Sequence, residues 1–281
     1  MEQAKVQNLA LTAARSRLLA LDMVYGAASG HIGGSLSSLD ILTTLYFHVM
    51  RVNPDAPQAP ERDRFVLSKG HCTPALYSTM AQRGFFPLEE LKQFRRIEGH
   101  MSGHAEMRHV KGVDMSTGSL GQGISAAVGM ALAGKADGRD YRVYALLGDG
   151  EIEEGQPWEA FMFAHQYKLD NLCVIIDNNN LQIDGKITDV MSPYPIPEKL
   201  RAFGFQVREI DGHDFEQMES AFDEARATKG VPFAIIMTTI KGKGVSFMED
   251  VAGWHGKAPN DEEYKTAMDE LKARLAEVEG M

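Results

Sequence analysis

The stretch YRVYALLGDGEIEEGQPWEAFMFAHQYKLDNLCVIIDNNNLQIDG, residues 141–185, decides the fold. Two short apolar runs within it, Val143–Leu147 and Leu172–Ile176, each stop at a cluster of turn-forming residues. Short continuous apolar runs are typical of strands buried on both faces of a parallel sheet. Between the runs, Pro157 suits the first turn of a helix, and Trp158–Tyr167 can continue it. The stretch therefore predicts a strand, a crossover helix and a second strand.

The polar residues that follow the two runs predict a shared ligand site. A right-handed crossover brings both strand ends to the sheet edge at which open α/β folds bind ligands. Asp149 and Asn179 would therefore meet in space, although they lie 30 positions apart (179 − 149 = 30). Together with the backbone carbonyl of Leu181, they form an all-oxygen set that suits Mg²⁺ or Ca²⁺. Gly148 and Gly150 would let the backbone approach a diphosphate closely.

The rest of the chain alternates between helical and strand patterns. The predicted helices are Glu2–Ala28, Leu36–Met50, Ile124–Leu132, Glu198–Phe203, Phe215–Ala227 and Asp261–Glu279. The further predicted strands are Arg64–Leu67, Gln206–Ile210 and Phe233–Thr239. This alternation predicts an α/β fold with a doubly wound, mostly parallel sheet and helices on both faces. We expect one domain over residues 1–281.

The composition is that of an ordinary globular enzyme. Hydrophobic residues make up 44% of the chain and charged residues 24%. A net charge of −10 argues against nucleic-acid binding, which needs a basic face. No apolar run has the length to span a membrane, and no signal peptide opens the chain. Cys72 and Cys173 show no metal-binding spacing, so we expect buried reduced thiols in a cytoplasmic enzyme.

Several histidines lie in loops that could form a site. His31 stands in the glycine-rich segment before the second predicted helix, and His71 follows a predicted strand at its carboxyl end. An isolated loop histidine is more often solvated or part of the core. His100, His104 and His109 are closely spaced, but intervening glycines break any helix and no further ligand completes a zinc set. We therefore expect no metal at these three histidines.

Five blocks of the chain resemble the transketolase family, and specifically its N-terminal, thiamine diphosphate-binding domain. They are SGHIGGSLSSLD, RFVLSKGHCTPALY, MSTGSLGQGISAAVGMAL, GDGEIEEGQPWEA and GVSFMEDVAGWHGKAPN. They occur in this order and span roughly residues 29–260. The resemblance implies that the fold is the thiamine diphosphate-binding (PP) domain. It also implies two cofactors, thiamine diphosphate and Mg²⁺, for which Ca²⁺ or Mn²⁺ can substitute.

The resemblance implies roles for four histidines. His31 and His104 would contact the substrate, and His31 would also lie by the reacting part of the cofactor. His71 would lie near the diphosphate and the reacting carbon. His255 would bind substrate hydroxyls and the diphosphate. Ala105 departs from the proline that usually follows the family's equivalent of His104.

Other cofactor contacts are implied beside the metal-binding turn Gly148-Asp149-Gly150 and Asn179. The loop residues Gly118, Ser119 and Leu120 would face the thiazole and pyrimidine rings. Lys241 follows the last predicted strand, and a lysine on such a glycine loop can reach a phosphate or a cofactor ring.

Glu154 has two interpretations. In the family, its counterpart joins a carboxylate network between the two cofactor sites of a dimer. From the residues alone, Glu154 and its neighbours Glu151 and Glu153 simply favour a helix N-terminus.

The resemblance also implies a partner chain. In transketolases, the glutamate that activates the cofactor, the aromatic clamp on its pyrimidine and the groups that grip the sugar phosphate belong to a second domain. No glutamate of this sequence matches the activating one. We therefore expect the partner to be a C-terminal transketolase subunit, in a heterotetramer of two plus two chains. The pair would transfer a two-carbon ketol unit between sugar phosphates such as those of the pentose phosphate pathway, and this chain alone would be inactive.

Three alternatives stay open at this stage. The first is a subunit similar to 1-deoxyxylulose-5-phosphate synthase, although that enzyme normally carries its domains in one chain. The second is the α subunit of a 2-oxo acid dehydrogenase, which lacks this set of histidines. The third is a non-catalytic, cofactor-binding paralogue.

Overall fold

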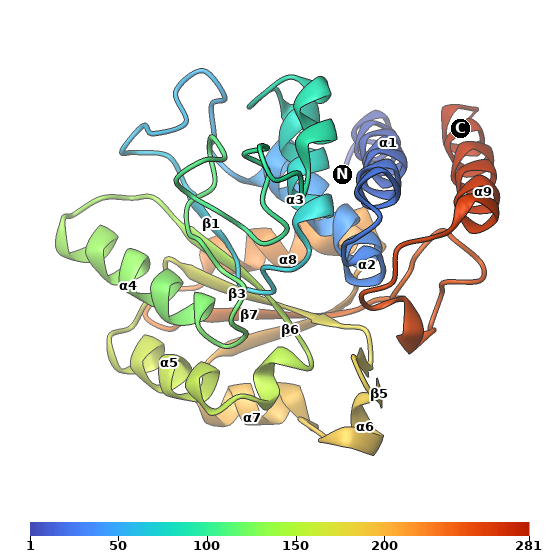
Figure 1. Ribbon diagram of the computed structural model, residues 1–281. Helices are drawn as coiled ribbons and strands as arrows, with labels where there is room; N and C mark the ends of the chain where they lie inside the picture. The colour runs from blue at the N-terminus through green and yellow to red at the C-terminus, as the bar shows by residue number, and fades with distance from the viewer. Residues whose placement is uncertain (281) are drawn as a thin grey trace.

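Five parallel strands form one sheet at the centre of the protein (Figure 1). The computed structural model describes residues 1–280. The strand order is β1-β2-β3-β7-β6, with bounds Arg64–Leu67, Val143–Gly148, Leu172–Asn178, Phe233–Thr238 and Gln206–Asp211. A small antiparallel hairpin of β4 (Leu181–Gln182) and β5 (Gly185–Lys186) follows β3.

Helices cover both faces of the sheet (Figure 1). One face carries α4 (Gly123–Ala136), α5 (Gly155–Gln166) and α7 (Ile196–Ala202). The other carries α1 (Gln3–Ala27), α2 (Ile32–Thr44), α3 (Thr73–Arg83) and α8 (Phe215–Ala227). The last helix, α9 (Asp261–Glu279), lies beside α1 (Figure 1). This arrangement confirms the predicted doubly wound α/β fold.

Shorter helical turns join these elements. They are η1 (Leu45–Val49), η2 (Leu88–Gln93), η3 (Glu151–Glu153), α6 (Ile187–Val190) and η4 (Ala252–Trp254). Among residues 1–280, no helix combines the length and the apolar character that crossing a membrane requires.

The central strands are apolar throughout because each of their faces meets a layer of helices. Val174 and Ile176 of β3 belong to the core under α4, α5 and α7, whereas Cys173 and Ile175 belong to the opposite core. All four side chains are fully buried. Successive strand residues point to opposite faces, so a strand in the middle of such a sheet needs an unbroken apolar run. Cys72 and Cys173 are buried free thiols, as predicted.

The predicted helix Leu36–Met50 was wrong at its start, which lies about one turn too late, and its end agrees to one residue. The structure starts α2 at Ile32 and continues it through the π-helical turn η1 to Val49. Gly33 therefore lies inside the helix, where an added Cβ would be 2.9 Å from the carbonyl oxygen of Trp254. This glycine allows two backbones to approach closely. Its sequence context does not show whether a glycine serves this purpose or belongs to a flexible loop. Helix α3 was not predicted, and the bounds of the other predicted elements agree to within about one helical turn.

Gly30 makes the turn that connects α1 to α2. Its φ is +150°, and an added Cβ would lie 2.8 Å from Cγ2 of Val24. Both the backbone angle and the contact disfavour a side chain at this position. Gly30 therefore sets the path of the chain into His31, the first candidate residue of the site.

We predict that Gly30→Ala lowers the free energy of unfolding by about 1–3 kcal/mol, because it adds strain and a core clash. The matched control is Gly26→Ala in α1, where an added Cβ meets no atom within 4 Å. Gly26 is the penultimate residue of α1, so replacing this glycine should stabilise by at most about 0.5–1 kcal/mol, the value for a helix interior. Urea unfolding followed by circular dichroism measures both. Equal stability of the two variants would contradict the role assigned to Gly30.

Candidate active site

The loops at the carboxyl ends of β1, β2, β3 and β7 surround one cavity of about 210 Å³. Ten of the residues that the sequence indicated line it: His71, Leu120, Gly148, Asp149, Gly150, Glu154, Asn179, Leu181, Lys241 and His255. The parallel register explains this convergence, because Gly148 at the end of β2 pairs directly with Asp177 of β3. A different hollow, of about 460 Å³, lies between the end of α1 and the segment 88–96, and none of its lining residues is a histidine.

The three residues whose oxygen atoms were predicted to bind a metal, Asp149, Asn179 and Leu181, line the same cavity. The Asp149 carboxylate accepts hydrogen bonds from the backbone N–H groups of Gly150 and Asn180. The Asn179 side-chain oxygen accepts the Leu181 N–H at 3.2 Å, and the Leu181 carbonyl accepts the Lys241 ammonium at 3.2 Å. Burial, followed by the nearby charge of Asp177, raises the pKa of Asp149 to about 7. Asp149 is thus a buried carboxyl without a cationic side chain bonded to it, which is the situation of a metal ligand before the metal binds.

A buried ion pair lies directly behind these oxygens. The Lys69 ammonium contacts the Asp177 carboxylate and donates to the carbonyl of Gly34 at 3.2 Å. Asp177 also accepts hydrogen bonds from the hydroxyls of Ser37 and Thr239. Burial opposes ionisation of Asp177, but the Lys69 charge and these hydrogen bonds hold its pKa below the ordinary value. The pair thereby joins α2, the loop after β1, the end of β3 and the loop after β7.

Four histidine rings form a cluster, and two of them, His71 and His255, line the cavity. The ring of His31 lies 5.0 Å from that of His71, 5.8 Å from His104 and 5.4 Å from His255. Burial is the main cause that lowers the pKa of all four. The values fall to about 4 for His31 and about 3 for His255. All four rings are therefore neutral at pH 7, and each offers one N–H donor and one acceptor.

Lys241 connects the histidine cluster to the oxygen set. Its Nζ lies 2.9 Å from Nδ1 of His255, in addition to its contact with Leu181. The loop is fixed against α2 because the N–H of Gly242 donates to the carbonyl of Gly33 at 3.0 Å. Burial, followed by the charge of Lys69, lowers the pKa of Lys241 to about 8. Lys241 is therefore a cation at neutral pH that is ready to exchange its protein partners for an anionic ligand.

Glu151 holds the loop before α4 against the turn after β2. Its carboxylate accepts the Ser68 hydroxyl, the N–H of Gly121 at 3.0 Å and the N–H of Gly148 at 3.1 Å. Glu151 lies in the first turn of η3, as expected of an acidic residue at a helix N-terminus, but its side chain is also buried. Burial raises the pKa of Glu151. Glu154, by contrast, is exposed at the cavity rim, immediately before the first residue of α5.

The three residues of the loop 118–120 lie at different places relative to the cavity. Leu120 lines the cavity, and an added Cβ on Gly118 would lie 3.0 Å from the ring of His104. Ser119 is exposed and lies outside the cavity lining.

The two remaining histidines of that region lie away from the cluster. His109 is exposed, and His100 contacts Glu90 and Gln93.

His213 precedes α8 but does not cap it. The cap of α8 is Asp214, which accepts two backbone N–H groups of that helix. The His213 ring lies 2.7 Å from the Asp40 carboxylate through Nδ1 and accepts the N–H of Ile240 at 3.0 Å through Nε2. Asp40 is itself bonded to the guanidinium of Arg17. Together these contacts hold Ile240, the residue that precedes Lys241, in place.

Comparison with known proteins places the chain in a family. A family model described as "Transketolase, thiamine diphosphate binding domain" matches residues 8–275. The chain belongs to the transketolase family. This membership confirms the resemblance inferred from the sequence blocks and the predicted enzyme class, a transketolase-type transferase that binds thiamine diphosphate.

Two relatives of similar length are themselves named as subunits. One, from Phocaeicola vulgatus, is named as a subunit of apulose-4-phosphate transketolase and is 44% identical over 98% of both chains. The other, from a Clostridium species, is named as a subunit of 6-deoxy-6-sulfo-D-fructose transketolase and is 46% identical over 91% of this chain and 93% of its own. This transketolase-family chain is thus similar over nearly its whole length to proteins that are named as subunits.

Other transketolases are much longer. Human transketolase is 44% identical over 91% of this chain, but that region is 41% of the human protein. The crystal structure of transketolase from Campylobacter jejuni has a TM-score of 0.88 and 34% identity, and covers 97% of this chain and 45% of its own. This chain spans slightly less than half the length of such relatives.

Sequence reasoning missed several residues that build the site. Lys69 stands between Ser68 and His71 in a loop that was singled out, and Asp177 ends an apolar run, so both carried a detectable signal. A polar residue next to a predicted ligand in the sequence is itself a candidate for a residue that holds the ligand in place. Arg95, which contacts His31, lies in a segment without any motif, and only the fold brings it to the site.

We predict that Lys69→Met lowers the free energy of unfolding by about 3–5 kcal/mol, because it leaves Asp177 as an unpaired buried charge. Adding Asp177→Asn should recover part of the loss, since the two residues are coupled. Urea unfolding of the wild type, both single variants and the double variant measures the coupling. A Lys69→Met variant within about 0.5 kcal/mol of the wild type, the usual effect of a surface change, would disprove this role.

Proposed function

We propose that this chain is the thiamine diphosphate-binding subunit of a two-chain transketolase. The complex would transfer a two-carbon ketol unit from a ketose to an aldose. The observation that carries the proposal is that one cavity contains an all-oxygen set and two histidines, His71 and His255, which belong to a cluster of four neutral histidines. The first suits a metal-bound diphosphate, and the second suits a polyhydroxylated substrate.

The donor atoms of the cavity fit a divalent cation and a diphosphate. Asp149, the side-chain oxygen of Asn179 and the carbonyl of Leu181 would bind Mg²⁺, and all three are hard oxygen ligands. Gly148 and Gly150 carry no side chain that would screen this carboxylate, and Gly150 has only Gln182 close to the position of a Cβ. Lys241 and His71, which line the same cavity, would contact the diphosphate. The buried, readily protonated Asp149 supports this assignment, since a cation would stabilise its ionised form.

The residues of this chain would then orient the substrate and move protons. Thiamine diphosphate, when bound, supplies the electron sink that allows a carbon–carbon bond to be broken and formed. His31, His71, His104 and His255 would donate to and accept from substrate hydroxyls. Each ring would be a suitable hydrogen-bond partner because it stays neutral at pH 7. His31, His71 and His255 are also half-buried, whereas His104 is exposed.

We propose that a C-terminal transketolase subunit completes the site. It would supply the glutamate that activates the cofactor and the groups that bind the far end of the sugar, in a heterotetramer of two plus two chains in the cytoplasm. The relatives named as subunits support a partner chain. Those two relatives are named for different sugars, which supports placing sugar selection mainly in the partner. Glu154, exposed at the rim, would face the second cofactor site across the dimer.

The test combines assembly with activity. Native mass spectrometry of the tagged chain, purified from its own cells with thiamine diphosphate and Mg²⁺, should show a second chain in a two-plus-two complex with two cofactors. The purified complex should transfer a ketol unit from xylulose 5-phosphate or a related ketose to an aldose, and the chain alone should be inactive. Product formation from pyruvate instead would indicate a 1-deoxyxylulose-5-phosphate synthase-like enzyme. Cofactor binding without turnover of any donor would indicate a non-catalytic paralogue.

We predict that Mg²⁺-dependent binding of thiamine diphosphate weakens about tenfold for each pH unit below 7, because the metal needs the ionised form of Asp149. The pKa of this carboxyl is raised, so protons compete with the metal below about pH 7 and not above it. Isothermal titration calorimetry of the full chain between about pH 5.5 and pH 7.5 measures the effect.

Two variants control for the assignment to this carboxyl. Asp149→Asn should weaken binding by at least about 100-fold and remove the pH dependence, since even the residues that support metal ligands contribute up to this factor. Asp184→Asn, in the exposed turn between β4 and β5, should behave as the wild type. Binding that is equally tight in Asp149→Asn would show that the metal lies elsewhere.

A further inference from the structure

Arg95 is held in an unusual backbone conformation beside the histidine cluster. Its φ is +54°, in the left-handed region that non-glycine residues rarely adopt. The preceding Phe94 is buried in the core, and the Arg95 N–H donates to the carbonyl of Met101 at 2.9 Å. Strain of this kind persists where the surrounding structure imposes it, often at functional sites.

The guanidinium of Arg95 is also fixed in place. It donates to the Ser29 hydroxyl at 3.2 Å through Nη1, and Nη2 lies 3.5 Å from Nδ1 of His31. It passes over Gly103, where an added Cβ would lie 2.3 Å from Nε of the arginine. Gly103 precedes His104 directly in the chain. Four separate features, the strained backbone, the serine contact, the histidine contact and the bare glycine, therefore direct this one side chain toward His31.

We propose that Arg95 is a positioning residue that fixes the His31 ring as the neutral, Nε2-protonated tautomer. An arginine side chain has no hydrogen-bond acceptor, so the His31 nitrogen that faces it can only accept. The remaining proton must then sit on Nε2, on the side of the ring away from Arg95. Without such a partner, neutral imidazoles exchange between two tautomers, and only one presents a donor from Nε2.

The other charged and titratable groups around His31 act in the same direction. His104 lies beside it in the loop after Gly103, and His71 comes from the loop after β1. Lys241 and His255 face it from the segment after β7. After burial, Arg95 is the largest influence that lowers the pKa of His31 to about 4, followed by His104 and Lys241. No carboxylate is among these neighbours, so loss of the Arg95 charge should make His31 easier to protonate.

This inference deepens the proposed function and, for its catalytic consequence, rests on it. A fixed Nε2–H donor would bind a substrate oxygen in the same orientation in each turnover. Loss of Arg95 would therefore lower kcat, because a fraction of molecules would present the wrong tautomer or an imidazolium ion. The tautomer itself can be read in the chain without cofactor or partner.

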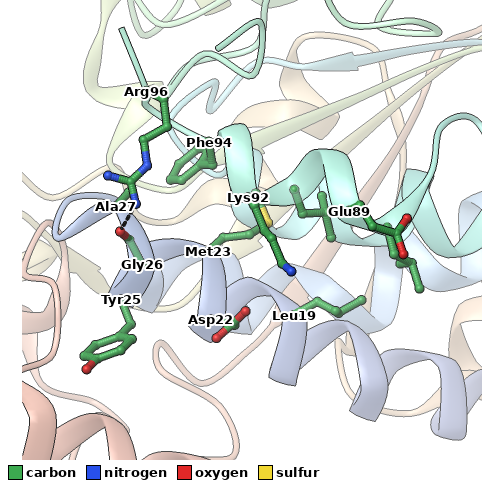
Figure 2. A pocket seen from close by; sticks show the side chains of 12 residues that line it. Leu19, Asp22, Met23, Tyr25, Gly26, Ala27, Glu89, Lys92, Phe94 and Arg96 are labelled. Atoms are coloured by element: carbon green, nitrogen blue, oxygen red, sulfur yellow. Dashed lines mark hydrogen bonds between the residues drawn. The ribbon is translucent and has the colours of Figure 1, made fainter. Parts of the chain in front are cut away.

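The experiment is NMR spectroscopy of the ¹⁵N-histidine-labelled full chain, in which long-range ¹H–¹⁵N correlations identify the tautomer of each ring. The His31 signals are assigned by their loss in His31→Gln. The variants are Arg95→Met and Arg95→Lys. The matched control is Arg96→Met: this adjacent arginine donates to the carbonyl of Gly26 and lies beside Phe94 (Figure 2).

In the wild type we expect His31 to be the Nε2–H tautomer and to remain neutral as the pH is lowered to about 5. Arg95→Met should give a mixture of tautomers and a pKa higher by about one unit or more. Arg95→Lys should keep most of the pKa shift, because the charge remains, but should fix the tautomer less well because the planar donor fork is gone. Arg96→Met should match the wild type. In the assembled complex, Arg95→Met should lower kcat more than it changes KM.

An Nδ1–H tautomer in the wild type, or unchanged His31 signals in Arg95→Met, would overturn the proposal. If Arg95→Met fails to fold, the tautomer of the wild type and of Arg95→Lys still decides the matter. A complex that is inactive with every sugar, together with the expected NMR result, would refute the proposed function and leave this inference standing.

Discussion

The ammonium of Lys69 and the carboxylate of Asp177 meet in the interior, at the point where the loops after β1, β3 and β7 converge on α2. Neither charge has access to water, so each depends on the other and on the hydroxyl and carbonyl groups around them. Because the pair bonds to four elements at once, it sets the spacing of the loops that carry His71, Asn179 and Lys241. The geometry of the cavity therefore depends on this interaction.

The electrostatics of the site separate into two zones. Around Asp149, burial and the charge of Asp177 disfavour the ionised carboxyl, so a bound cation would be strongly stabilised there. Around the four histidines, burial and the cations Lys241 and Arg95 disfavour protonation. A metal-bound diphosphate and a neutral, hydroxyl-rich substrate need these two environments side by side. One sheet edge provides both, because adjacent parallel strands end within a few ångströms of each other.

Much of the fold could be predicted because parallel sheets impose a simple pattern. Strands buried on both faces require continuous apolar runs, and Leu172–Ile176 showed one directly. Helix α8 was predicted with the right ends, Phe215 and Ala227. Where glycines mark close packing instead of loops, the prediction failed, as at the start of α2. The glycine at 33 looks the same in sequence whether its neighbour is water or the backbone of residue 254, 221 positions along the chain (254 − 33 = 221).

The sequence by itself determined the family, the strand ends that carry the ligands, and the identity of the histidines, because these depend on local motifs and on the rule that parallel strands share one ligand edge. Tertiary structure alone decided what surrounds each of them. The burial of Glu151, the contact of His213 with Asp40, and the approach of Arg95 to His31 join segments without a common pattern. Contacts of this kind depend on how helices and loops pack across the sheet, and packing leaves no periodic trace in the sequence of either partner.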